Sequence, residues 1–133
     1  MILDEIIELR RASGIDFGET YVDLLRYYKD CQRYGYLEFI WEDGELKGFI
    51  DWMRCTHLPE KRDFTWKDMP LIGRGDYIYI TTLCAKEKKY FWRLLAMVRK
   101  AEKNDCKYIC FHRKDGSLKV YPNMKGALDH VQV

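Results

Sequence analysis

Apolar residues recur every three or four positions in three parts of the chain, and this spacing predicts three amphipathic helices. The first helix is expected over residues 1–12, because Ser13-Gly14 is a typical helix stop. The second is expected over residues 20–33, with Thr20 as its N-terminal cap. The third follows residue 86, and its apolar face consists of Phe91, Leu94, Leu95, Val98 and Ala101.

Stretches rich in aromatic and β-branched residues predict strands between these helices. Residues 36–42 and 45–54 are expected to form a hairpin, because Asp43-Gly44 between them favours a two-residue turn. Alternation along the second strand puts Leu46, Gly48, Ile50 and Trp52 on one face, and Lys47, Phe49, Asp51 and Met53 on the other. Further strands are expected over residues 77–83, 107–113 and 118–121.

The order of these elements predicts the fold class. A strand, a helix and a second strand in the same sheet imply a right-handed crossover and a parallel strand pair. We therefore expect an α/β protein with a mixed, mostly antiparallel sheet and helices on both faces. At 133 residues the chain has the length of a single domain, residues 1–133. Residues 55–74 form a long connection of the kind that is often functional.

Composition and charge limit the cellular location and the kinds of partner that we expect for this protein. No apolar run approaches the ~20 residues that a membrane helix needs, and the acidic, amphipathic N-terminus resembles no export signal. We therefore expect a cytoplasmic protein whose five cysteines are reduced. Residues 1–85 contain eleven Lys and Arg and sixteen Asp and Glu, whereas residues 86–133 contain twelve Lys and Arg and five Asp and Glu. The second part of the chain therefore favours an anionic or acidic partner.

Three lysines, Lys86, Lys88 and Lys89, lie where the third helix is expected to begin. Cations are disfavoured at a helix N-terminus, which carries partial positive charge, unless an anion binds among them. The simpler interpretation is a solvated basic face, and on the sequence alone we slightly prefer it.

The order of elements resembles the GCN5-related N-acetyltransferase superfamily, in which the helix after the central strand takes the coenzyme A pyrophosphate. The RTX toxin-activating lysine acyltransferases are similar over residues 36–126. The similar segments are Gly48–Trp52, Leu58–Lys61, Trp66, Gly73–Asp76, Tyr77–Lys86 and Lys107–Arg113 with Asp115-Gly116. The superfamily's glycine-rich loop is absent, because residues 85–89 read AKEKK. The chain also has no histidine before His57, and Thr82 stands where the toxin-activating family has an aspartate.

The resemblance implies an acetyltransferase-like fold and an acyl donor, either acyl-CoA or acyl-phosphopantetheine on an acidic acyl carrier protein. The donor would meet the end of the central strand and the helix start, at Thr82, Leu83, Cys84, Lys86, Lys88 and Lys89. The acceptor would be an amine, with a protein lysine as the expected class. The alternative is a non-catalytic relative that kept the fold as an interaction or structural module.

Three residues are candidates for acid–base chemistry. Asp51 lies between Ile50 and Trp52 and would be a general base if its apolar neighbours raise its pKa. We prefer the simpler expectation that Asp51 faces solvent. His57, in the long connection, is a second candidate base, although a lone loop histidine is usually only solvated. Tyr121 is a candidate acid for a departing thiolate.

Two further classes of function are less favoured. Cys106, Cys110 and His112 have a spacing that zinc can use, but they lack a fourth ligand, so we expect packed thiols and no metal. Tyr90-Phe91-Trp92 in a basic helix could stack nucleic-acid bases. A net charge of +2 is low for a dedicated nucleic-acid binder, so we do not expect one.

Overall fold

The computed structural model describes residues 2–15, 18–58, 75–102 and 106–123. In chain order the elements are α1 (Leu3–Ala12), α2 (Tyr21–Tyr34), β1 (Leu37–Glu42), β2 (Glu45–Cys55), β3 (Tyr77–Ala85), α3 (Lys88–Ala101), β4 (Tyr108–His112) and β5 (Leu118–Pro122). The strands form one sheet in the order β1-β2-β3-β4-β5. The pairs β1–β2 and β4–β5 are antiparallel, and β3–β4 is parallel. These findings confirm the predicted α/β class and mixed sheet.

The chain forms two compact units. One contains residues 1–51 and 82–97, and the other contains residues 52–81 and 98–133. We call them the helical unit, because it holds α1, α2 and most of α3, and the sheet unit, because it holds β4 and β5. The assignment of residues 1–133 to a single domain stays a prediction. Most of the expected connection, residues 59–74 with Trp66, lies outside the described residues.

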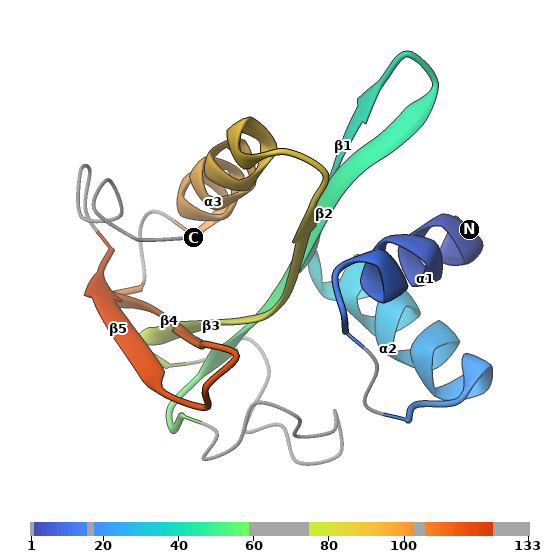
Figure 1. The fold of residues 1–133 in the computed structure, drawn as a ribbon. Coiled ribbons are helices and arrows are strands. Elements are labelled where there is room, and N and C mark those ends of the chain that lie inside the picture. The colour runs from blue at the N-terminus through green and yellow to red at the C-terminus, as the bar shows by residue number, and fades with distance from the viewer. Residues whose placement is uncertain (1, 16–17, 59–74, 103–105, 124–133) are drawn as a thin grey trace. The chain divides into compact units, whose positions relative to one another are not determined.

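In the helical unit, successive residues of β2 face different helices. A side chain at Gly48 would place its Cβ 3.1 Å from Cδ1 of Leu94 on α3 and 2.9 Å from the carbonyl oxygen of Cys84. The next residue, Phe49, packs edge-on against Tyr28 of α2, with ring centroids 6.0 Å apart. Within this unit the helices therefore cover both faces of the sheet, as predicted and as Figure 1 shows.

Local sequence signals account for the ends of these elements. Thr20 caps α2 by accepting a 3.1 Å hydrogen bond from the backbone N–H of Asp23, as predicted. Asp43 and Gly44 both have positive φ angles, 54° and 73°, which suit a two-residue hairpin turn. The hairpin contains one bulge, at Lys47, whose carbonyl accepts a 2.9 Å hydrogen bond from the N–H of Lys86.

The sheet unit has its own buried cluster, formed by Met53, Cys55, Tyr79 and Cys110. Next to this cluster on β2, the Trp52 side chain is fully buried. Its indole Nε1 donates a 3.2 Å hydrogen bond to Glu102, and Arg54 pairs with the same carboxylate at 3.2 Å. An aromatic side chain, an arginine and a carboxylate thus hold β2 to the segment after α3.

The burial of Trp52 leads to a stability prediction with an internal control. Trp52→Ala should lower the free energy of unfolding by ~3–5 kcal/mol, because it leaves a cavity and removes one of the two hydrogen-bond partners of Glu102. Trp41→Ala makes the same change at a side chain that is 44% exposed, and it should cost at most ~1 kcal/mol. Urea denaturation of both variants measures the difference. Equal losses would contradict the burial described for Trp52.

Candidate functional site

The candidate site is a buried polar cluster in the helical unit, and Asp51 on β2 is its centre. The Asp51 side chain has no solvent exposure, so the expectation that it faces solvent is wrong. It is buried because α2 packs on that face of the strand, where Tyr27 donates a short hydrogen bond to Asp51 Oδ1. The other oxygen, Oδ2, is also buried and has no hydrogen-bond partner among the described residues.

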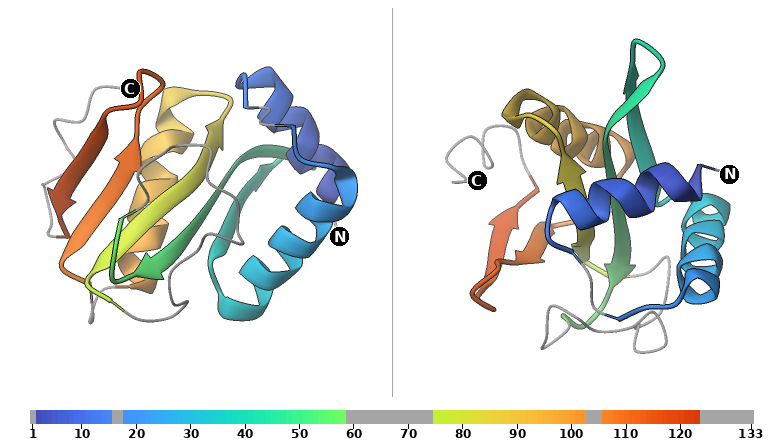
Figure 2. Two further views of the ribbon diagram at one scale, coloured as in Figure 1. Left: turned by 90° about the horizontal axis from the view of Figure 1, so that it is seen from below. Right: turned by 45° about the vertical axis from the view of Figure 1, so that its right-hand side comes forward.

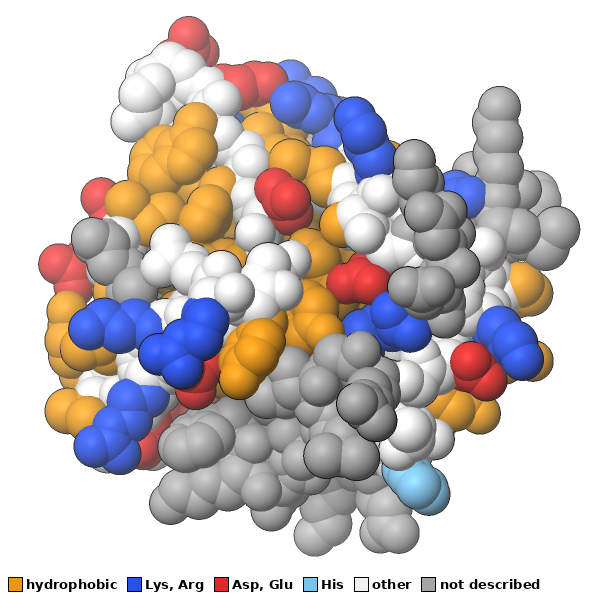
Figure 3. Space-filling model, turned by 180° about the vertical axis from the view of Figure 1, so that it is seen from behind, with side chains coloured by type: hydrophobic (Ala, Val, Ile, Leu, Met, Phe, Trp, Pro, Cys, Tyr) orange, Lys and Arg blue, Asp and Glu red, His pale blue; other side chains and the backbone are white. Residues whose placement is uncertain are grey.

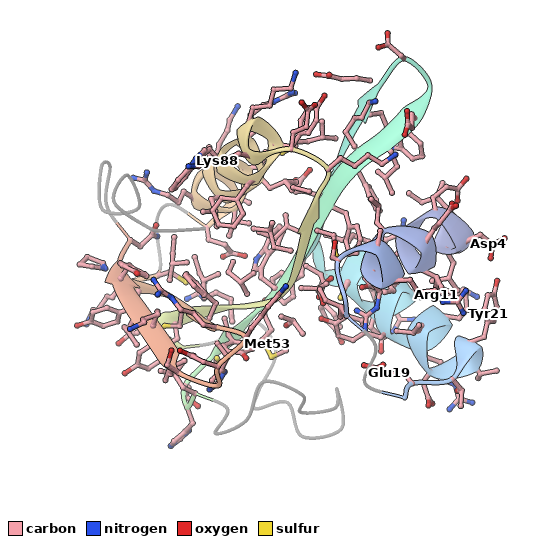
Figure 4. All side chains as sticks on the ribbon, viewed as in Figure 1. Asp4, Arg11, Glu19, Tyr21, Met53 and Lys88 are labelled. Carbon is pink, nitrogen blue, oxygen red and sulfur yellow. The ribbon has the colours of Figure 1, made fainter. Side chains whose placement is uncertain are left out.

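Arg10 of α1 is the buried cation of this cluster, with an exposed fraction of 5%. Its Nη1 lies 3.1 Å from the hydroxyl of Tyr28 and 3.3 Å from Thr82 Oγ1 on β3. Its Nη2 pairs at 3.3 Å with Glu19, which is labelled in Figure 4 on the connection between α1 and α2. Arg10 therefore links both helices to β3 beside Asp51.

Burial dominates the ionisation of Asp51. Desolvation raises the pKa of its carboxyl from 3.8 to about 6, because the charged form is disfavoured away from water. The hydrogen bond from Tyr27, the charge of Arg10 and the nearby hydroxyls of Tyr28 and Thr82 each lower the pKa and limit the rise. Above pH 6 the Asp51 side chain is therefore mostly ionised, and this carboxylate can accept a proton near neutral pH.

The two tyrosines remain hydrogen-bond donors at neutral pH. Burial raises the pKa of both Tyr27 and Tyr28 well above the usual range, and the charge of Asp51 raises them further. Burial tends to lower the pKa of Arg10, but the fields of Tyr28 and Asp51 outweigh it, so Arg10 stays charged. At neutral pH the cluster therefore contains a guanidinium, two phenols and one carboxylate of adjustable charge.

The expected donor residues at the end of β3 have different surroundings. Thr82 is buried at Arg10, as described above, and Leu83 is half-buried. Cys84 is 1% exposed, and its carbonyl oxygen faces Gly48. A role for Cys84 as a nucleophile would require an approach to a buried thiol, so packing is the simpler account of it.

The three lysines near the start of α3 are all exposed. Lys86 forms an ion pair with Glu45 of the hairpin. Lys89 lies 3.9 Å from Glu87, at the limit of an ion pair, and Lys88 projects from the first residue of α3 in Figure 4. One of the three charges is thus already neutralised by a carboxylate.

A second acidic residue of the hairpin contacts the first turns of α3. Glu42 accepts hydrogen bonds from Tyr90 at 2.7 Å and from Arg93 at 2.8 Å. These contacts fix the helix on the hairpin and add negative charge near the lysines. Figure 3 shows basic and acidic side chains interspersed on the face that it draws.

The remaining acid–base candidates belong to the sheet unit, whereas Asp51 belongs to the helical unit. His57 is exposed, and its Nδ1 lies 2.9 Å from the hydroxyl of Thr56. Tyr121 is half-buried on β5 and stacks on Phe111, with ring centroids 5.8 Å apart. Each side chain is accessible, but neither has a described charged partner that would tune it.

The cysteines and His112 do not form a cluster with metal ligands. All five cysteines are buried, and none forms a disulfide. The Nδ1 of His112 lies 2.7 Å from the hydroxyl of Tyr79. Among the described residues there is no group of three or more His, Cys, Asp and Glu side chains that could hold a metal ion. In the same part of the chain, no helix is long and apolar enough to cross a membrane.

Sequence reasoning missed the partners of Asp51. Arg10 follows Leu3 and Ile6 at seven- and four-residue intervals, which puts its charge on the buried stripe of α1. Tyr27 and Tyr28 are both buried on α2. A charged residue at an apolar position of an amphipathic helix is a signal for a buried ion, and the sequence contains that signal at Arg10.

Comparisons with known proteins place the chain in no family. No protein-family model matches it, and no curated protein matches it. Among solved structures, it is similar to one named "putative acetyltransferase" from Staphylococcus aureus Mu50, with 20% sequence identity. The match covers 83% of this chain and 70% of that one, with a TM-score of 0.48.

Proposed function

We propose that the chain transfers an acyl group from a phosphopantetheine thioester to an amine. The amine nitrogen attacks the thioester carbonyl carbon, so a C–N bond forms and the C–S bond breaks. The amine gives up a proton to the carboxylate of Asp51, and the pantetheine thiolate leaves and is protonated. The acyl group arrives on coenzyme A or on an acyl carrier protein, and the acceptor is a protein lysine.

The observation that carries this proposal is the state of Asp51. A general base must be able to accept a proton at the working pH, and a pKa of about 6 meets that condition. It must also offer an atom to the reacting amine, and Oδ2 has no hydrogen-bond partner among the described residues. Tyr27 meanwhile holds the other oxygen, which fixes the carboxylate's orientation.

The donor end of the proposal rests on charge. The chain from residue 86 on has twelve Lys and Arg against five Asp and Glu, which suits an acidic carrier or a pyrophosphate. Lys88 and Lys89 are exposed where such an anion would approach the first turn of α3. Tyr121 remains the candidate acid for the leaving thiolate, and His57 remains the second candidate base.

A non-catalytic interaction module is the second candidate, and specific contacts favour it. Lys86 forms an ion pair with Glu45, and Arg93 forms one with Glu42. Two carboxylates of the hairpin therefore already neutralise part of the basic surface. Asp51 has no exposed surface through which an acceptor could reach it without movement of α1 or α2. A module would retain the buried cluster only as a structural feature that orients its helices and strands.

Asp51→Asn separates the two candidates, because asparagine keeps the shape and the acceptor for Tyr27 but removes the base. The transfer rate should fall by ~10²–10⁴-fold. The parent's rate should rise with pH through about 6, the pKa of Asp51, and this rise should vanish in the variant. The rate is measured as the amount of coenzyme A released over time, which chromatography quantifies. Asp4→Asn, at an exposed aspartate, is the matched control. An active parent whose rate is unchanged in Asp51→Asn would refute the assigned role.

The same variant should show a pH-dependent gain in stability. The folded pKa of Asp51 lies above its unfolded value of 3.8, so the folded state binds the proton more tightly between pH 4 and 6. The ionised group therefore destabilises the fold above pH 6, and this penalty disappears below pH 4. A shift of about two pKa units corresponds to ~3 kcal/mol. In urea denaturation, the stability difference between Asp51→Asn and the parent should favour the variant most above pH 6 and shrink toward pH 4.

Reversal of Lys86, Lys88 and Lys89 to glutamate tests the donor site. Binding of coenzyme A or acyl carrier protein should weaken, with each lost charged contact worth ~1.5–3 kcal/mol at low salt. The effect should shrink as salt rises, because exposed charges are screened. Calorimetric titration of parent and variant measures both trends. Stability should fall by at most ~1 kcal/mol, since Lys86 loses its surface ion pair with Glu45.

The matched control reverses Lys100, Lys107 and Lys114, three other exposed lysines, and so changes the net charge equally. If both triple variants weaken binding alike, the net positive charge of the chain attracts the ligand, and the three lysines at the start of α3 do not form a specific binding site. If the parent binds no pantetheine compound at low salt, the acyltransferase proposal fails and the interaction module replaces it.

A further inference from the structure

Strand β5 is the last strand in the order β1-β2-β3-β4-β5, so among the described residues its outer side is a sheet edge. Figure 2 shows it in red-orange as the outermost strand beside β4. Exposed edges attract other strands, and proteins usually protect them with charged residues that point outward. This edge contains one lysine, Lys119, and one proline, Pro122, but it also carries exposed apolar side chains. Leu118 is 37% exposed, Val120 is 45% exposed, and Tyr108 on the same face of β4 is 37% exposed.

The register of β5 on β4 shows which backbone groups point outward. The N–H of Asn123 donates to the carbonyl of Lys107 at 2.8 Å, and the N–H of Arg113 donates to the carbonyl of Ser117 at 2.9 Å. In an antiparallel pair, hydrogen-bonded positions alternate with positions whose N–H and C=O point away. Leu118 and Val120 therefore direct their backbone groups outward, and so does the carbonyl of Pro122.

This outward pattern is complementary to itself around Val120. If a second β5 runs antiparallel, the two Val120 residues exchange both of their hydrogen bonds. The N–H of Leu118 then donates to the carbonyl of Pro122 of the second copy. Because proline has no N–H, the carbonyl of Leu118 receives no hydrogen bond from that residue and faces solvent at the end of the contact. On the opposite face Lys119 lies across from Tyr121 of the second copy, so no like charges oppose each other.

We propose that β5 pairs with β5 of a second copy of this chain, antiparallel and centred on Val120, and joins two sheets into one. The occupant is a second copy because both outward N–H groups of the strand, those of Leu118 and Val120, find carbonyl acceptors in an identical strand, and no like charges oppose each other. Leu118, Val120 and Tyr108 supply the apolar area that leaves water in the contact. The inference concerns the sheet unit alone and does not depend on the proposed acyl transfer.

Sedimentation velocity across a range of protein concentration up to ~0.5 mM tests the proposal. The parent should show a reversible monomer–dimer equilibrium. Val120→Pro removes the central outward N–H but no bond to β4, and it should weaken self-association by at least ~10-fold while circular dichroism stays unchanged. Val120→Lys places two like charges opposite each other and should weaken it similarly. Val22→Lys, at a valine that is 54% exposed on α2, is the matched control and should leave the equilibrium unchanged.

Hydrogen exchange gives a second readout that does not require a variant. The amides of Leu118 and Val120 should become protected as concentration rises, whereas those of Lys119 and Tyr121, which point toward β4, should be protected throughout. A parent that stays monomeric at all concentrations overturns the proposal. A dimer that Val120→Lys and Val120→Pro leave intact overturns it too, because the interface then lies elsewhere. If Val120→Pro alone fails to fold, Val120→Lys and the exchange data decide.

Discussion

The burial of one carboxylate, Asp51, and one guanidinium, Arg10, within a single polar cluster is the constraint on which the helical unit depends. Removing either charge from water costs several kcal/mol, and their attraction repays that cost only with further hydrogen bonds. Asp51 receives a bond from Tyr27, and Arg10 is held by Tyr28, Thr82 and Glu19. These partners come from α1, α2, β2, β3 and the connection between the helices, so the cluster fixes five segments relative to one another.

The cluster is also incompletely satisfied, and this is what connects the fold to a function. An apolar core of the same volume would avoid the desolvation cost altogether. The chain instead retains a buried carboxylate with one oxygen that has no partner among the described residues and with a pKa raised to about 6. Groups whose pKa is shifted by burial and a specific charge partner are concentrated at functional sites. We therefore assign the acyl-transfer proposal to this cluster rather than to the more accessible His57 or Tyr121.

Sequence reasoning predicted the elements well because each depends on local signals. The Asp43-Gly44 turn, the Thr20 cap and the spacing of Leu94, Leu95 and Val98 specify their structures within a few residues. The sequence did not predict the burial of Asp51. A strand residue between two apolar neighbours is expected to face solvent unless a second layer covers its own face, and the packing of α2 on the Asp51 face is a long-range contact. The lysine candidates depended on a second long-range fact, the ion pair from Lys86 to Glu45, which no local spacing encodes.

The ionisation of Asp51 in the folded protein is the measurement that tests this account most directly. Carbon-13 NMR of the labelled aspartate carboxyls, assigned by comparison with Asp51→Asn, follows each group through a pH titration. The account predicts that Asp51 takes up its proton near pH 6, well above the exposed aspartates. A midpoint at or below the ordinary value of 3.8 would contradict it, because the carboxylate would then be fully stabilised where it lies and unsuited to accept a proton from an acceptor amine.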